Sequence, residues 1–79
     1  MYGFLNGSLI ATDSKNREQM MKCFSENARI RYTIGAPLWL MSENGAEMKT
    51  SPVEKVIASR DGIVKLWTRS GTYYCIALD

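Results

Sequence analysis

The chain has 79 residues, 46% of them apolar, and a formal net charge of +2 at pH 7. A chain this short is expected to form one domain, residues 1–79, around a small core. The mild charge argues against a dedicated nucleic-acid-binding arm. Neither a membrane-spanning apolar run nor a signal peptide is evident, so we expect a cytoplasmic protein without membrane contact.

The N-terminal third predicts a strand or hairpin followed by a helix. Residues 2–5 and 8–12 flank Asn6-Gly7, a pair typical of tight turns, and form either a hairpin or one strand with a glycine bend. The side chains of Thr12-Asp13-Ser14 are then suited to capping a helix. Apolar residues recur at helical spacing over residues 15–27, which predicts an amphipathic helix of about three turns packed on the sheet.

The middle of the chain predicts three short strands. Residues 29–34 alternate between apolar and polar, with arginines on the outer side, and Gly35-Ala36-Pro37 ends this strand. Residues 38–41 form the next strand, and residues 46–50 return after a polar turn. Ser51-Pro52 is expected to end that strand as a bend, because proline has no N–H to give to a central ladder.

The last third predicts a three-stranded antiparallel meander. Three apolar-rich runs, residues 53–60, 63–69 and 72–78, are separated by Asp61-Gly62 and Ser70-Gly71. Glycine dipeptides between strand-like runs are strong hairpin signals, because the turn residues need positive φ.

The turn lengths would set the register of this meander. If both turns contain two residues, Trp67 pairs with Val56 on one side and with Tyr74 on the other, and the three form the centre of one face. Neither face is cleanly polar, which suits a strongly curved sheet. We therefore expect an α+β fold: a small, strongly curved antiparallel sheet or SH3-like barrel of five to six short strands, with one amphipathic helix near the N-terminus. The second choice is a single sheet with the helix across one face.

The sequence offers little for catalysis. Histidine is absent, which removes the commonest general base and metal ligand. Cys23 and Cys75 are too few for a structural zinc site and are expected to be free thiols. We predict no catalytic residue, no metal and no cofactor, and hence a protein that is not an enzyme. A thiol-dependent enzyme is the third hypothesis, which replacing both cysteines would test.

An apolar run around a tryptophan is the first candidate for a binding surface. Residues 38–41 follow a proline and precede a polar turn, and exposed Trp and Met are favoured at protein interfaces. The competing interpretation is a strand buried on both sides. An outer strand could also pair with a partner or a second copy, which would make a homodimer. The predicted partner-binding residues are Trp39, Leu38, Met41, Arg29, Arg31, Arg60 and Arg69.

The alternative is single-stranded nucleic acid. Small barrels bind single strands by stacking bases on aromatic rings beside a positive groove. For this alternative the candidate residues are Tyr32, Lys55, Lys65 and Trp67. The competing interpretation is that the aromatic rings belong to the core and the charges only solvate the strands.

One stretch carries a resemblance. Lys49-Thr50-Ser51-Pro52-Val53, Asp61-Gly62-Ile63-Val64 and residues 68–74 resemble the C-terminal hairpins of small uncharacterised phage and prophage accessory proteins. The resemblance implies an accessory protein of a phage or mobile element that binds and blocks a host protein, such as a CRISPR defence nuclease, in the host cytoplasm. We therefore expect a non-enzymatic protein-binding module, with the nucleic-acid-binding barrel as the alternative.

Overall fold

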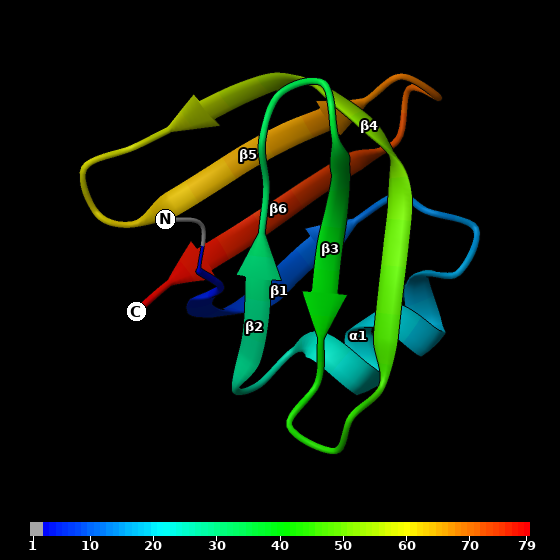
Figure 1. Cartoon of the computed structure of the whole chain (residues 1–79), viewed down its shortest axis with the longest axis vertical. Helices are drawn as coiled ribbons and strands as arrows, with labels where there is room; N and C mark the ends of the chain where they lie inside the picture. The colour runs from blue at the N-terminus through cyan, green and yellow to red at the C-terminus, as the bar shows by residue number, and fades with distance from the viewer. Residues whose placement is uncertain (1–2) are drawn as a thin grey trace.

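The structure is a computed structural model that describes residues 3–79. Its elements are β1 (Leu5–Thr12), α1 (Arg17–Phe24), β2 (Ala28–Arg31), β3 (Pro37–Met41), β4 (Glu47–Ala58), β5 (Ile63–Thr68) and β6 (Tyr73–Leu78). Each strand pairs antiparallel with the next, and β6 pairs with β1 (Figure 1). The predicted small, curved antiparallel sheet with one helix is confirmed. It closes in a ring, so the second choice, an open sheet under a helix, is wrong.

The segment around Asn6-Gly7 is one strand, so the hairpin interpretation is wrong; Tyr2, which that interpretation included, lies outside the described residues. Gly7 pairs with Ala28 of β2 and with Leu78 of β6. A Cβ atom on Gly7 would overlap the carbonyl oxygen of Ala77. This glycine therefore permits a close approach of β1 and β6 and does not form a turn.

The helix is shorter than predicted and lies at one open end of the ring (Figure 1). It begins after Asn16, because the hydroxyl groups of Thr12 and Ser14 accept backbone N–H bonds within the preceding turn, at 3.1 and 3.2 Å, and do not cap α1. Its buried side chains, Met20 and Phe24, lie in the core and close that end of the ring.

Strand β4 bends at Pro52, as predicted, but it continues through this residue, so the prediction that the strand ends there is wrong. Pro52 faces Pro37 of β3, and the register shifts on both sides of this pair. The Thr50 hydroxyl accepts the Leu38 N–H at 3.1 Å, and the Pro52 carbonyl accepts the Arg69 N–H at 2.8 Å. A proline is tolerated here because the strand bends at irregularities where its missing N–H is not needed. The first half of β4 thus pairs with β3 and the second half with β5.

Both turns of the C-terminal meander contain three residues, so the predicted two-residue turns are wrong. Ser59 N–H donates to the Ile63 carbonyl at 2.8 Å, and Thr68 N–H donates to the Thr72 carbonyl at 3.0 Å. Each loop ends on a glycine with positive φ, as a type I turn followed by a bulge requires. The turn between β3 and β4 has the same pattern, from Ser42 to Ala46.

The longer turns shift the register by one residue relative to the prediction. Trp67 pairs with Lys55 and Tyr73, whereas Val56 and Tyr74 pair with Leu66. Because side chains alternate faces with period two, this shift places Trp67 on the outer side of the ring and separates it from Val56 and Tyr74.

The core fills the inside of the ring and draws on every element. The buried core consists of Leu9, Met20, Phe24, Ala28, Ile30, Leu38, Leu40, Val53, Val64, Leu66, Tyr74 and Ile76.

Ile34, predicted on the buried side of its strand, is 65% exposed, because β2 ends at Arg31 and Ile34 makes only an isolated parallel bridge to Val53.

We expect Gly7→Ala to destabilise the fold where the ring closes. The added methyl group meets backbone atoms of β6, which cannot move without separating the two strands, so the loss should be about 1–3 kcal/mol in urea unfolding. Gly3→Ala is the matched control, since a Cβ there meets nothing within 4 Å. Equal stability of the two variants would contradict this account of ring closure.

A second prediction concerns the turn between β4 and β5. The Ser59 hydroxyl donates to the Asp61 carboxylate, and this bond, with the Asp61 backbone N–H, lowers the pKa of Asp61 below its ordinary value. Because the folded pKa is depressed, any contribution to stability is present above the unfolded pKa and is lost as pH falls through the folded pKa. In an NMR titration, Ser59→Ala should raise the Asp61 pKa; an unchanged value would contradict the bond.

Candidate binding surfaces

A row of three long side chains crosses the outer side of β2, β3 and β4. Trp39 of β3 pairs with Arg31 of β2 on one side and with Lys49 of β4 on the other. Leu38 and Leu40, the neighbours of Trp39 along β3, point inward and are fully buried. Alternation along the strand therefore turns Trp39 outward between two basic residues.

Trp39 is held in place by contacts with its ring. Lys49 Nζ lies 4.0 Å from the ring centroid, a distance suited to a cation–π interaction. The Phe4 ring meets Trp39 edge-on, with centroids 5.1 Å apart at 79°. The indole Nε1 is shielded from solvent and has no hydrogen-bond partner among residues 3–79. Trp39 is thus a half-buried ring with one unused donor.

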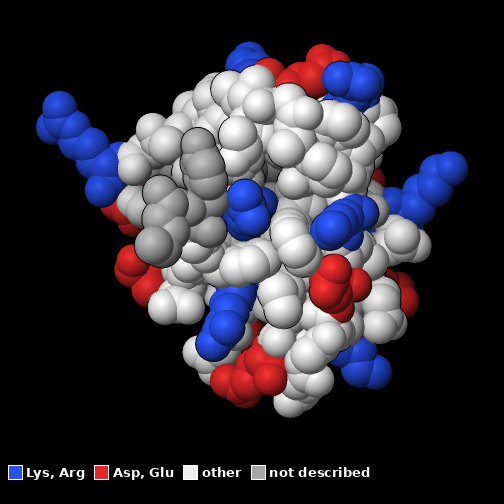
Figure 2. Space-filling model, in the orientation of Figure 1, with Lys and Arg blue, Asp and Glu red and all other residues white. Residues whose placement is uncertain are grey.

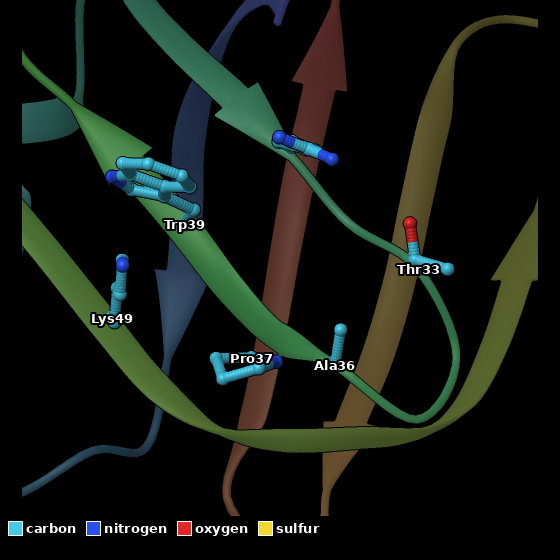
Figure 3. Close-up of a pocket in the computed structure, with 6 residues that line it drawn as sticks. Thr33, Ala36, Pro37, Trp39 and Lys49 are labelled. Carbon is cyan, nitrogen blue, oxygen red and sulfur yellow. The ribbon is translucent and has the colours of Figure 1, made fainter. Parts of the chain in front are cut away.

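A hollow of about 320 Å³ opens beside Trp39 (Figure 3). Pro37 and Ala36 form an apolar wall from the start of β3 and the loop before it, while Lys49 approaches from β4. The hollow is lined by Arg31, Thr33, Ala36, Pro37, Trp39 and Lys49. An apolar wall together with two basic side chains suits a partner's apolar side chain that has an acidic residue next to it. The surface formed by these six residues is called the Trp39 surface below.

The next row of the same outer side extends this surface. Arg29 of β2 pairs with Met41 of β3, and Met41 pairs with Glu47 of β4. Met41 is half-buried and Arg29 is exposed. The structure therefore brings together Arg29, Arg31, Trp39 and Met41, four of the seven residues predicted to bind a partner.

The other three predicted residues do not join this surface. Leu38 is fully buried in the core, so choosing it as an exposed contact was wrong. Arg60 and Arg69 lie in the turns at opposite ends of β5, and neither lines the hollow beside Trp39. Sequence spacing could not show this, because the turns are brought to their places by the ring.

The residues of the nucleic-acid alternative are also divided. Lys55 and Trp67 pair across β4 and β5, and Lys65 lies two residues before Trp67 on the same side of β5. Tyr32 follows β2 and packs partly against the core, so it does not belong to this group. The outer side of β4, β5 and β6 is therefore a second aromatic and basic surface, separate from the Trp39 surface.

The predicted site residues did not include Lys49 and Phe4, which contact the Trp39 ring, or Tyr73, which lies beside Trp67. They also did not include Thr33, Ala36 and Pro37, which line the hollow. The shared turn pattern was the available signal. Ser42-Glu43-Asn44-Gly45, Ser59-Arg60-Asp61-Gly62 and Thr68-Arg69-Ser70-Gly71 each place a hydroxyl residue three positions before glycine. Read as three-residue loops, the last two give the register that pairs Trp67 with Lys55 and Tyr73.

Charges are spread over the face of the molecule that Figure 2 shows. Figure 2 shows Lys and Arg side chains at several separate places on the viewed face, with Asp and Glu between them.

Within residues 3–79, Cys, Asp and Glu form no group of three or more suited to a metal ion. No helix in that range has the length and apolar character needed to cross a bilayer. Both cysteines are free, Cys23 on α1 and Cys75 on β6.

Comparisons with protein-family models, with curated proteins and with solved structures found no match. The function is therefore argued from the residues of the two surfaces.

The electrostatic setting of Trp39 can be tested with ionic quenchers. In a Trp67→Phe background, iodide should quench Trp39 fluorescence more strongly than caesium, because Arg31 and Lys49 flank the ring. Lys49→Gln should reduce the difference, whereas Lys22→Gln on α1 should not. Equal quenching by the two ions would contradict a basic surrounding of Trp39.

Proposed function

We propose that the protein is a non-enzymatic protein-binding module, and that the Trp39 surface contacts an acidic segment of its partner. The supporting observation is the hollow beside Trp39, which is lined by the apolar residues Ala36 and Pro37 and by the basic residues Arg31 and Lys49. A partner side chain would enter the hollow while neighbouring carboxylates meet the two basic side chains. Interfaces of this kind depend on a few buried anchors with charges around them.

The shape of the surface favours a protein segment over a small molecule. The volume of about 320 Å³ is at the lower end of small-molecule pockets, and the hollow is open to solvent. An open hollow buries only part of a free small molecule, but it can accept one side chain of a larger partner. The remaining affinity then comes from contacts around it, such as those of Arg29 and Met41 in the next row.

The same surface is poorly suited to stacking nucleic-acid bases. Among residues 3–79, Trp39 is the single aromatic residue that lines the hollow. Phe4 meets the ring edge-on and so does not add a parallel platform. Base stacking needs open aromatic faces, which supports a protein partner here.

Ring closure leaves few strand edges for a partner. Each strand described in residues 3–79 pairs with two others, but each half of β4 pairs with one strand only, residues 47–52 with β3 and residues 53–58 with β5. Strand addition, one of the routes expected from the sequence, needs an unpaired edge, and within the ring the two halves of β4 supply one. Strand addition and a homodimer therefore both stay predictions beside recognition through side chains.

The narrower roles inferred from the sequence are special cases of this proposal. One is an inhibitor from a phage or mobile element that acts in the host cytoplasm and occludes a host defence protein, such as a CRISPR nuclease, by stoichiometric binding. Its support is the resemblance of residues 49–53, 61–64 and 68–74. The fold prediction of an SH3-like barrel likewise stays a proposal, and the small size and curvature of the ring support it.

The proposal is tested by selecting binders from a random peptide library displayed on phage. We expect the selected peptides to be rich in Asp and Glu around one apolar residue. Trp39→Ala should weaken their binding about thirtyfold or more, as truncation of a buried interface anchor does. Arg31→Gln and Lys49→Gln should each weaken it and reduce its salt dependence.

The matched control is Ile34→Ser, which changes an exposed apolar residue outside the Trp39 surface. This variant should bind the peptides as well as the original chain does. Peptides without acidic residues, or unchanged binding after Trp39→Ala, would overturn the proposal.

A further inference from the structure

The outer side of β4, β5 and β6 carries a second aromatic group. Trp67 pairs with Tyr73, and their ring centroids are 5.2 Å apart at an interplanar angle of 44°. Lys55 pairs with Trp67 from the other side, with Nζ 5.2 Å from the centroid of the indole ring. Trp67 and Tyr73 are called the aromatic platform below.

Basic side chains border the platform. Lys65 is exposed on β5, two residues before Trp67 and thus on the same side of the strand. Lys55 is also exposed, and Arg69 follows Trp67 by two residues in the next turn. Lys65 lies on β5, the strand that carries the indole, and Lys55 lies on β4, the strand paired with it.

The acidic groups near the platform are few. Asp13 lies at the start of β6, where its carboxylate accepts the Tyr73 N–H at 2.8 Å. Glu54 is exposed beside Lys55 in the chain, at the register shift of β4. A side-chain hydrogen bond with Cys75 raises the pKa of Tyr73 above its ordinary value, at which a phenol is already uncharged at neutral pH. The ring of Tyr73 therefore brings no negative charge to the platform.

We propose that this outer side binds single-stranded nucleic acid, with bases stacking on Trp67 and Tyr73 and phosphates meeting Lys55 and Lys65. Two neighbouring aromatic rings beside ammonium groups are the elements that single strands require. The Nζ atom of Lys55 lies 5.2 Å from the centroid of the indole ring. Because Lys55 is exposed, a phosphate can draw this side chain away from the ring without disturbing the core. The binding is sequence-tolerant, because every base has a face that can stack.

This site is independent of the Trp39 surface. Lys49 and Lys55 belong to the two halves of β4, on either side of the bend at Pro52. Figure 1 shows β4 running beside β3 and then turning to run beside β5. A failure of either proposal thus leaves the other standing.

The first measurement uses a fluorescein-labelled oligo(dT) of roughly ten nucleotides and fluorescence anisotropy at low salt. Contacts with two phosphates predict a slope of about −1.4 for log K against log salt, so affinity should fall about sevenfold between roughly 50 and 200 mM salt. Trp67→Ala should weaken binding by about tenfold or more. Circular dichroism checks that this variant is folded.

The lysine variants keep the test valid if Trp67→Ala does not fold. Lys55→Gln/Lys65→Gln changes two exposed side chains and should abolish most of the salt dependence and weaken binding. The matched control, Lys15→Gln/Lys22→Gln, lowers the net charge by the same amount at exposed positions in and before α1. It should bind like the original chain. Equal loss in both pairs would overturn the proposal, because net charge alone would then explain binding.

The two tryptophans of the chain allow the bound strand to be located. In Trp39→Phe, Trp67 is the sole tryptophan, and its fluorescence should be quenched when unlabelled oligo(dT) binds. In Trp67→Phe, the remaining Trp39 should show no quenching. Quenching of Trp39 alone, or no binding at low salt, would overturn the proposal. The proposal would also be overturned if an acidic peptide quenched the fluorescence of Trp67 and oligo(dT) did not, since the face would then be a protein site.

Discussion

Closure of the ring through the pairing of β1 with β6 is the contact on which the structure depends. Gly7 lies in this contact and packs against the backbone of β6, at a place where any side chain would separate the strands. The Leu78 N–H also donates to the Gly62 carbonyl at 2.8 Å, which ties the end of β6 to the turn before β5. Because the ring is closed, a chain of 79 residues can surround one core with its short strands.

The bend of β4 explains why such a small ring carries two different outer surfaces. Pro52 faces Pro37, and the register shifts on each side let β4 change partners from β3 to β5. At the bend, the Ser51 and Ser70 hydroxyls lie 3.0 Å apart, and Ser70 also contacts Thr68 at 3.0 Å. The hydroxyl groups of Ser51, Thr68 and Ser70 together join the bend to the turn after β5. One strand thereby supplies Lys49 to one surface and Lys55 to the other.

Much of the local structure could be predicted from residue patterns. The order of strands and helix followed from apolar periodicity, and glycine marked the turns between β3 and β4, β4 and β5, and β5 and β6. The failures came where a residue had two physical roles. One of the two interpretations of Gly7 placed it in a hairpin turn, whereas it serves close packing within one strand. Pro52 was expected at a bend that ends a strand, whereas β4 bends there at a bulge and continues. Local propensity does not distinguish these roles, because the deciding contact is made by a distant strand.

By itself, the sequence determined that the chain forms short strands with one helix, and that it contains no histidine for proton transfer or metal binding. It also showed that tryptophan, tyrosine and basic residues are interleaved. Only the tertiary structure decided which of them share a surface. A register shift of one residue reverses the face of every side chain in a strand, so three-residue turns placed Trp67 beside Lys55 and Tyr73. Pairing across β2, β3 and β4 likewise placed Trp39 between Arg31 and Lys49.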